Sequence, residues 1–279
     1  MDGSSSIQLL SDGAVKFDGG VLFGQIPKGI WQEWMVPDRR NRVKLGLNCL
    51  LVTIGSKNYL VDTGGGQKLS SSERDLYGLT GSSLITSLRN HGLTPQDIDG
   101  VILSSLQFEH TGGCTKRDRK GDLVPSFPKA TYYVQKSAFD EAMYPNERNV
   151  GSFVQDDFYP LDQKGVLKLL DGDTQIVPGI QVRKTGGPSI GHQICLITHG
   201  GEWVAYLGDL IPTHFHLQLP CISSNDKSPE ETLNSKRSIM MEAASDGWLL
   251  IFSHGTDSKS GYLELRNGRS HLRRIDLSH

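Results

Sequence analysis

The residue types that bind metal ions gather in a few short polar clusters of the sequence, each of which follows an apolar run. The clusters are 62–66, 104–113, 187–192 and 208–209, and Phe252-Ser253-His254 closes the series. If the apolar runs are strands that end at one edge of a sheet, carboxylates and histidines from these clusters meet there. Imidazole and carboxylate groups are the ligands expected for a borderline divalent ion. The pattern therefore predicts a metal site at a sheet edge.

The apolar runs are short and rich in β-branched residues, which predicts strands. They lie at 43–54, 59–62, 101–106, 131–135, 180–185, 193–198, 203–208 and 249–253. Neighbouring runs without a helical segment between them, at 43–62 and 180–208, predict hairpins. A helix is predicted from 83 to 91. A second helix is predicted between Ser228 and Gly247, with Ser228 as N-cap, a first-turn proline and a capping box closed by Glu231.

Strands covered by outer helices, without a strict alternation of the two, predict an α/β layered fold with mixed sheets. No repeat or low-complexity linker divides the chain, so we expect residues 1–279 to form a single domain. The polar segment 115–128 and the segment 136–165 are expected to be long irregular loops over one edge of that domain.

Composition and charge narrow the functional classes. The chain has 279 residues, and 29 Lys+Arg against 31 Asp+Glu leave a formal net charge of −2. This balance gives no reason to expect a nucleic-acid partner. No apolar run is long enough to cross a membrane and the first residues lack a secretory signal, so we expect a cytoplasmic protein with no membrane partner. The four cysteines form no C-x-x-C pair, which argues against a zinc knuckle or a redox motif.

The order of the motifs resembles that of the metallo-β-lactamase superfamily, and within it the lactonase and organophosphate-hydrolase-like branch. The resemblance runs through nearly the whole chain and rests on Asp62-Thr63-Gly64, Glu109-His110-Thr111-Gly112-Gly113, Gly191-His192-Gln193, Gly208-Asp209-Leu210 and Ser253-His254. It implies a four-layer αβ/βα sandwich, with two mixed sheets flanked by helices. It also implies a small-molecule substrate or ligand and, because relatives are often dimers, a homodimer as one option.

The metal motif of that family, H-x-H-x-D-H, is degenerate in this chain. Aligned on the Glu109 segment, the first two histidines of the motif fall on Ser105 and Gln107. Together with His192 these positions would form the first metal site, and a hydroxyl and an amide replace imidazoles poorly on zinc. The second site keeps a set of four ligands, which are Glu109, His110, Asp209 and His254. The resemblance therefore implies at most one well-formed metal site.

The resemblance also assigns roles to single residues. Asp62 is implied to be a structural carboxylate beneath the metal loops, and Asp209 is implied to bind the metal and help to accept the proton of the attacking water. Each has a simpler interpretation: Asp62 as an Asp-Gly turn after a strand, and His110 or His254 as a hydrogen-bonded histidine in a polar pocket. His192 could instead cap a strand end or contact substrate.

Other residues near the predicted site are less specific. His214 and His216 closely follow Asp209 and are candidate replacement ligands, although histidines in loops are commonly solvated. Four aromatic residues could form an apolar pocket wall, although aromatic side chains more often belong to the core. They are Phe23, Trp31, Trp34 and Phe215.

Three functions are compatible with this pattern. The first is a hydrolase-like enzyme with one divalent metal, zinc or else iron or manganese, that activates water to attack an ester, lactone or phosphoester. The second is a pseudoenzyme that binds a small ligand in the same cleft without turnover, with no metal required. The third, ranked lowest, is an active dinuclear lactonase that uses Ser105 and Gln107 as unusual ligands.

Overall fold

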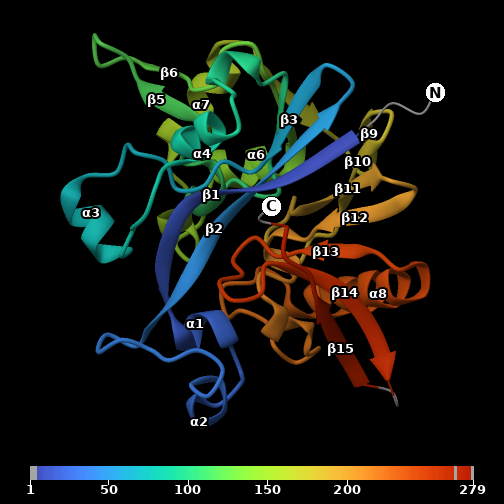
Figure 1. The fold of residues 1–279 in the computed structure, drawn as a ribbon. Helices are drawn as coiled ribbons and strands as arrows, with labels where there is room; N and C mark the ends of the chain where they lie inside the picture. The colour runs from blue at the N-terminus through green and yellow to red at the C-terminus, as the bar shows by residue number, and fades with distance from the viewer. Residues whose placement is uncertain (1–4, 267–268, 278–279) are drawn as a thin grey trace.

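Two sheets stack face to face and carry helices on their outer sides, as Figure 1 shows for a computed structural model that describes residues 5–266 and 269–277. The strands of the first sheet lie in the order β1 (Ser5–Asp18), β2 (Arg42–Ile54), β3 (Lys57–Val61), β4 (Gly100–Ile102), β7 (Thr131–Gln135) and β8 (Leu167–Leu170). Strands β1 to β3 pair antiparallel, whereas β3, β4, β7 and β8 pair parallel. The sheet is therefore mixed.

The second sheet is also mixed, but only one of its pairs, β12 with β13, is parallel. In spatial order its strands are β15 (Arg269–Arg274), β14 (Ser260–Arg266), β13 (Leu249–Ile251), β12 (Glu202–Tyr206), β11 (Gln193–His199), β10 (Ile180–Lys184) and β9 (Thr174–Val177). The predicted hairpins at 43–62 and 180–208 correspond to β2–β3 and to β10–β11–β12.

The helices are mostly short. They are α1 (Gly19–Phe23), α2 (Lys28–Trp31), α3 (Ser71–Leu76), α4 (Leu84–Asn90), α5 (Phe108–Thr111), α6 (Lys136–Met143), α7 (Gln155–Gln163) and α8 (Pro229–Asp246). Four 3-10 turns accompany them: η1 (Pro95–Asp97), η2 (Val150–Ser152), η3 (Gly208–Leu210) and η4 (His214–Leu217). Among the described residues, no helix combines the length and hydrophobicity that crossing a lipid bilayer requires.

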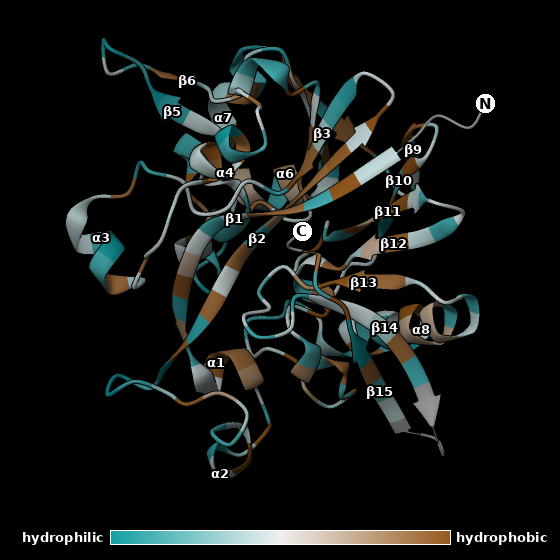
Figure 2. Cartoon of the chain, in the orientation of Figure 1, coloured by the Kyte–Doolittle hydropathy of each residue, from teal (hydrophilic) through white to brown (hydrophobic). Residues whose placement is uncertain are grey.

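Three buried clusters hold the layers together. Val52 and Val61 of the first sheet pack with Ile197 of the second, so one cluster fills the space between the sheets. A second cluster joins α4, α6 and α7 to the outer face of the first sheet, and a third joins α8 to the outer face of the second. Figure 2 shows that β13 is hydrophobic along its length. The expected four-layer α/β sandwich is confirmed.

Both predicted helices are present. Helix α4 begins after Ser83, whose hydroxyl accepts a hydrogen bond from the Thr86 amide, and α8 ends at Gly247, which has φ 68°. The Ser228 hydroxyl accepts a hydrogen bond from the Glu231 amide, as predicted. The Glu231 carboxylate does not close a capping box, because it accepts a hydrogen bond from the Gly187 amide at 3.0 Å instead.

The predictions of long irregular loops were wrong. Segment 115–128 contains a two-stranded hairpin of β5 (Thr115–Arg117) and β6 (Leu123–Pro125), and segment 136–165 contains α6 and α7. Helix α7 contains Pro160, a residue that usually interrupts a helix. Pro160 is buried in this helix together with Phe158 and Leu161. Strand β1, which was also missed, is polar at many positions because only one of its faces is buried.

Candidate metal centre

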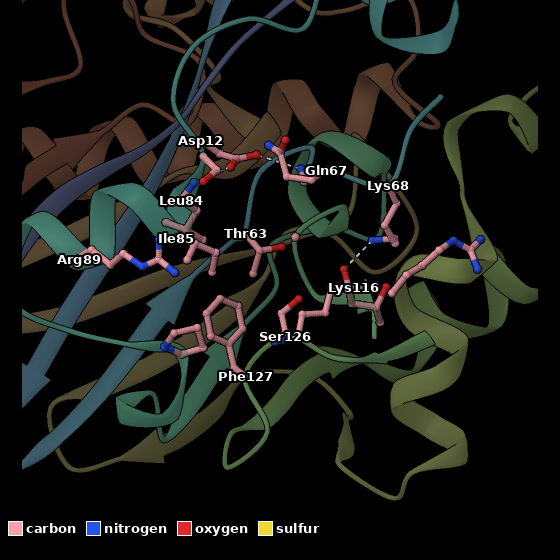
Figure 3. A pocket seen from close by; sticks show the side chains of 16 residues that line it. Asp12, Thr63, Gln67, Lys68, Leu84, Ile85, Arg89, Lys116, Ser126 and Phe127 are labelled. Atoms are coloured by element: carbon pink, nitrogen blue, oxygen red, sulfur yellow. Dashed lines mark hydrogen bonds between the residues drawn. The ribbon is translucent and has the colours of Figure 1, made fainter. Parts of the chain in front are cut away.

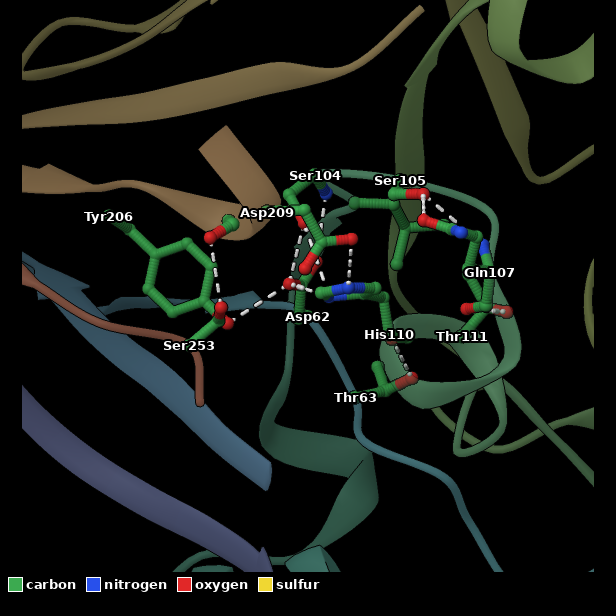
Figure 4. Close-up of polar contacts among 12 residues, drawn as sticks. Asp62, Thr63, Ser104, Ser105, Gln107, His110, Thr111, Tyr206, Asp209 and Ser253 are labelled. Carbon is green, nitrogen blue, oxygen red and sulfur yellow. Dashed lines mark hydrogen bonds and ion pairs between the residues drawn. The ribbon is translucent and has the colours of Figure 1, made fainter. Parts of the chain in front are cut away.

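The predicted polar clusters meet at the edge where the two sheets open. Asp62 directly follows β3, Ser104 follows β4 after one residue, Asp209 lies in η3 after β12, and His254 follows β13. Because β3 and β4 are parallel, as are β12 and β13, the ends of these strands face the same edge. Figure 4 shows Asp62, His110 and Asp209 converging there.

The side chains of His110, Asp209 and His254 form a compact group of possible metal ligands, which we call the metal group. Asp209 Oδ2 lies 3.0 Å from His110 Nε2, and Asp209 Oδ1 lies 3.3 Å from His254 Nε2. One ligand atom from each of the three residues lies within 4.8 Å of the others. The group is largely sheltered, since the side chains of His110 and His254 are 1% and 3% exposed.

Asp62 orients His110. Its Oδ2 accepts a hydrogen bond from His110 Nδ1 at 2.7 Å, and its two oxygens also accept from the amide and hydroxyl of Ser104 at 2.8 and 2.7 Å. The Tyr206 hydroxyl lies 3.0 Å from the same Oδ2. Asp62 has φ 59°, so the chain turns sharply as it leaves β3. A carboxylate that holds the Nδ1 proton leaves Nε2 of the ring directed at Asp209.

His254 is oriented by the backbone of the other sheet. Its Nδ1 lies 2.8 Å from the carbonyl oxygen of Gly46 in β2, and because a carbonyl can only accept, Nδ1 carries the proton. The close approach requires glycine, since a Cβ at position 46 would lie 2.6 Å from the Gly255 oxygen. His254 Nε2 has no hydrogen-bond partner among the described residues, although it is buried.

The electrostatics of the group favour a cation between the two rings. Burial disfavours an imidazolium, but Asp209 and Asp62 outweigh it and raise the pKa of His110 well above its usual value. Burial likewise disfavours the charge on Asp209, but His110 holds the pKa of that carboxyl well below its usual range. His254 Nε2 and Asp209 Oδ1 lie 3.3 Å apart, and no hydrogen bond joins them. A positive ion between the rings would be attracted by the carboxylate of Asp209.

The geometry also fits a metal. A tetrahedral zinc ion with N and O ligands at about 2.0–2.1 Å separates neighbouring ligand atoms by about 3.3 Å. The two distances from Asp209 to the histidines, 3.0 and 3.3 Å, are close to that value. Three protein ligands that leave one position open are typical of a catalytic site and not of a closed structural one.

Glu109 lies beside this group but outside it. It precedes His110 in α5, is 8% exposed, and its carboxylate makes no hydrogen bond to another described side chain. Burial raises the pKa of Glu109, and the neighbouring Asp209 acts in the same direction. The structure therefore brings together three of the four expected ligands of the second site and leaves Glu109 as a free carboxylate facing the same cavity.

The residues at the first metal site of the family pattern, Ser105, Gln107 and His192, make hydrogen bonds within the protein. The Ser105 hydroxyl donates to Gln107 Oε1 and accepts from the Gln107 amide, each at 3.2 Å. His192 Nε2 accepts from the Asp209 amide at 3.0 Å, and its Nδ1 therefore donates to Thr185 Oγ1 at 2.6 Å. Burial lowers the pKa of His192 to about 4, so the ring is neutral. In this structure the ring contacts the backbone of Asp209 and is not part of the group of possible ligands, so its role as a ligand stays a prediction.

A close contact explains the glycine next to Asp209. Gly208 has φ 52°, and a Cβ there would lie 2.6 Å from His192 Nε2 and 2.9 Å from the Cβ of Ser104. The 3-10 turn η3 can therefore hold Asp209 against both sheets only with glycine at this position.

The two histidines after Asp209 are not near the group. His216 is buried and hydrogen-bonded, with Nε2 3.1 Å from the Leu22 oxygen and Nδ1 2.8 Å from Thr213 Oγ1, and burial lowers its pKa to about 3. His214 Nδ1 lies 3.9 Å from Asp257 Oδ1. Neither belongs to the group of possible ligands in the described chain.

The proposed aromatic wall is instead a packed cluster. Phe23 stacks on Trp31 and on His216, and Trp34 stacks on Phe215. Phe23 and Trp31 are 0% and 1% exposed, so they fix α1 and α2 against η4 and do not face a ligand.

A small cavity of about 40 Å³ lies over the group. Its polar lining includes Glu109, Asp209, His254 and Asp226, and its apolar lining includes Phe17, Val21, Leu22 and Leu45. Asp226 was missed by sequence reasoning because it lies in an irregular polar segment with no motif around it. Such a cavity holds a few water-sized groups, whereas sites for drug-sized ligands are about 300–1,000 Å³.

The sequence and the fold of the chain are similar to those of known proteins. The sequence pattern of the metallo-beta-lactamase superfamily matches residues 43–254. The structure of a probable metal-dependent hydrolase from Staphylococcus aureus is similar, with TM-score 0.88 and 28% identity over 99% of both chains. The fold is shared with a dizinc quorum-quenching lactonase bound to its product, with TM-score 0.79, 19% identity, and 98% and 95% of the two chains covered.

The chain belongs to the metallo-beta-lactamase superfamily. Within that superfamily it is similar to the lactonase-like branch. An N-acyl homoserine lactonase from Bacillus cereus is 27% identical over 168 residues, which cover 56% of this chain and 60% of the relative. The match therefore spans less than two thirds of that lactonase.

Proposed function

We propose that the chain is a hydrolase with a single divalent metal, zinc or else iron or manganese, that acts on an ester, lactone or phosphoester. The observation that carries the proposal is His254 Nε2, a buried ring nitrogen without a hydrogen-bond partner that faces a carboxylate already in contact with His110. The similarity to a probable metal-dependent hydrolase supports the same conclusion.

His110, Asp209 and His254 would hold the ion. A bound divalent ion supplies Lewis acidity toward water and toward the carbonyl or phosphoryl oxygen of the substrate. Asp62 keeps the proton of His110 on Nδ1, and Gly46 keeps that of His254 on Nδ1. An oxygen of Asp209 would accept the proton of the attacking water, and the carboxylate of Glu109, which has no hydrogen bond to another described side chain, offers a second acceptor in the same cavity.

A second candidate function is ligand binding without turnover. Two observations favour it: the Ser105–Gln107 hydrogen bonds replace one metal site, and the cavity of about 40 Å³ leaves little room for substrate. In that case the chain would keep the cleft of its family and bind a small molecule there. A dinuclear lactonase, the third candidate, would require Ser105 and Gln107 to exchange these bonds for metal contacts.

Metal analysis of protein purified without chelator separates the three candidates. One equivalent per chain supports the proposed enzyme, none supports the binding protein, and two support the dinuclear lactonase. Hydrolysis of a γ-lactone, an aryl ester and a phosphotriester is then compared before and after treatment with a chelator. Turnover that survives complete metal removal would contradict the proposal.

A further inference from the structure

A larger cavity lies on the other side of the loop that carries His110. Its volume is about 460 Å³, within the range of small-molecule sites and far above the 40 Å³ of the cavity over the metal group. The walls come from the segments after β3 and before β7, from α4, and from the β5–β6 hairpin. The two cavities share no lining residue, so this one is a separate site.

One part of the lining is apolar. Leu84 and Ile85 of α4, Pro95 of η1, and Phe127 line it, and Phe127 is fully buried in the protein core. Figure 3 shows Ile85 and Phe127 beside Thr63. Ile85 and Pro95 are only half-buried, so they offer a ligand a hydrocarbon surface, which rewards burial of an apolar body.

The hydroxyl of Ser126 is left without a partner in this lining. Ser126 is 5% exposed, and its side chain makes no hydrogen bond to any described residue. The other hydroxyl groups here are used: Thr63 Oγ1 donates to the His110 oxygen, and Thr115 Oγ1 donates to the Asp156 oxygen. Ser126 Oγ is not among the buried polar atoms that lack a partner, so the oxygen is accessible and can donate a hydrogen bond to a ligand or accept one from it.

Charge in the lining is mostly positive. Lys68 pairs with the buried Asp157 at 2.9 Å, and Arg117 pairs with Asp156 at 3.2 Å. Arg89 and Lys116, by contrast, have no ion pair or side-chain hydrogen bond among the described residues. Figure 3 shows Arg89 on one side of the cavity and the Lys116 segment on the other.

The single acidic residue in the lining is already satisfied. Asp12 Oδ2 accepts from the Gly66 amide at 2.8 Å, and Oδ1 accepts from the Leu84 amide at 2.6 Å. Both oxygens are thus engaged with the backbone, and the unpaired cations are free to take an anion from solution.

We propose that this cavity binds a small amphipathic carboxylate, in which a carboxylate group is attached to an aliphatic body. The carboxylate would pair with the cations that line the cavity, Arg89 and Lys116, and the body would lie against Ile85 and Pro95. Ser126 would donate a hydrogen bond to one carboxylate oxygen. The proposal is independent of the hydrolase activity, because it uses no residue of the metal group.

Octanoate tests the proposal, with 1-octanol as its uncharged counterpart. Calorimetric titration is expected to show saturable binding of octanoate at one site, and binding of 1-octanol at least about tenfold weaker. Ile85→Trp, which fills the cavity, is expected to abolish both. Equal affinity for the two probes, or no saturation by octanoate, would overturn the proposal.

Charge variants test the anion contact. Arg89→Gln combined with Lys116→Gln is expected to weaken octanoate about tenfold or more and to leave 1-octanol unchanged. Both residues are exposed, so folding should be preserved, which thermal unfolding verifies. The matched control, Lys164→Gln combined with Arg237→Gln, removes the same charge from exposed positions elsewhere and should bind octanoate like the parent. Equal weakening by the control pair would show that only net charge matters and refute the site.

A chelator distinguishes this cavity from the metal group, where a carboxylate could also bind. Octanoate affinity is expected to be unchanged after metal removal. Binding that disappears with the metal would place the probe at the metal group and contradict the proposal.

Discussion

Replacement of Asp226 by Asn should change how folding stability depends on pH. Asp226 is 5% exposed, lines the cavity over the metal group, and accepts a hydrogen bond from Thr232 Oγ1 at 2.6 Å. Burial raises the pKa of Asp226 from 3.8 to about 7, although the Thr232 hydrogen bond opposes the change. The folded state therefore binds this proton more tightly than the unfolded chain does.

The sign and size follow from that difference. A raised carboxyl pKa means that stability is highest at low pH and is lost as pH rises from the unfolded value through the folded one. From about pH 5 to pH 8 the loss covers about two pKa units, and at about 1.4 kcal/mol each it amounts to about 2.7 kcal/mol. Asn cannot ionise, so Asp226→Asn should gain about this much relative to the parent over that interval.

Urea unfolding of chelator-treated protein at the two pH values measures the difference, because the metal would otherwise alter the charge around Asp209. Thr232→Val is the control: it removes the hydrogen bond that Thr232 donates but keeps the carboxyl group of Asp226, so its stability should still fall as pH rises. If the parent and Asp226→Asn differ by the same free energy of unfolding at both pH values, the reasoning about burial of Asp226 is refuted.

Three further predictions concern the metal group. Asp209→Asn should lower the metal content from one equivalent to less than about a tenth, measured by elemental analysis, because no carboxylate then joins the two histidines; retention of the ion would contradict this ligand set. His192→Leu should lower the free energy of unfolding by about 2–3 kcal/mol in urea while the metal stays bound, because it removes two buried hydrogen bonds and no ligand; loss of the metal at unchanged stability would contradict that role. Ser105→His combined with Gln107→His should add a second equivalent of metal and raise lactone or phosphotriester hydrolysis, and no gain would show that the first site was reshaped more deeply.

The elements that position the metal group were predictable because each combines a periodic pattern with a terminating residue. Strands β3, β12 and β13 are short runs, and Asp62, Gly208 and Ser253 follow them within two residues. Helix α8 has both its N-cap and its left-handed glycine. Strand β1 and helix α7 lacked such signals. Their stability comes from tertiary contacts, which override local propensity, and these contacts involve residues distant in sequence.

The position of the metal group was predictable, but the orientation of its side chains was not. The order of the motifs along the sequence predicted that His110, Asp209 and His254 lie together and bind one metal ion. The partner of each ring nitrogen depends on distant backbone, such as the Gly46 carbonyl for His254 and the Asp209 amide for His192. For the same reason the sequence could not separate a liganding His192 from a positioning one. Buried Lys236, whose ammonium donates to the Gln218 and Cys221 oxygens, left no trace in any motif either.

The hydrogen bond from His254 to Gly46 has a consequence for assembly of the molecule. His110 lies in α5, between strands of the first sheet, whereas Asp209 and His254 follow strands of the second sheet. Gly46 and Asn48 of β2, in the first sheet, make hydrogen bonds to the segment that carries His254. An ion held by the three side chains would cross-link the two sheets, because its ligands come from both of them. Binding of the metal should then slow hydrogen exchange of the backbone amides in both sheets to a similar extent, because the two sheets would unfold as one cooperative unit.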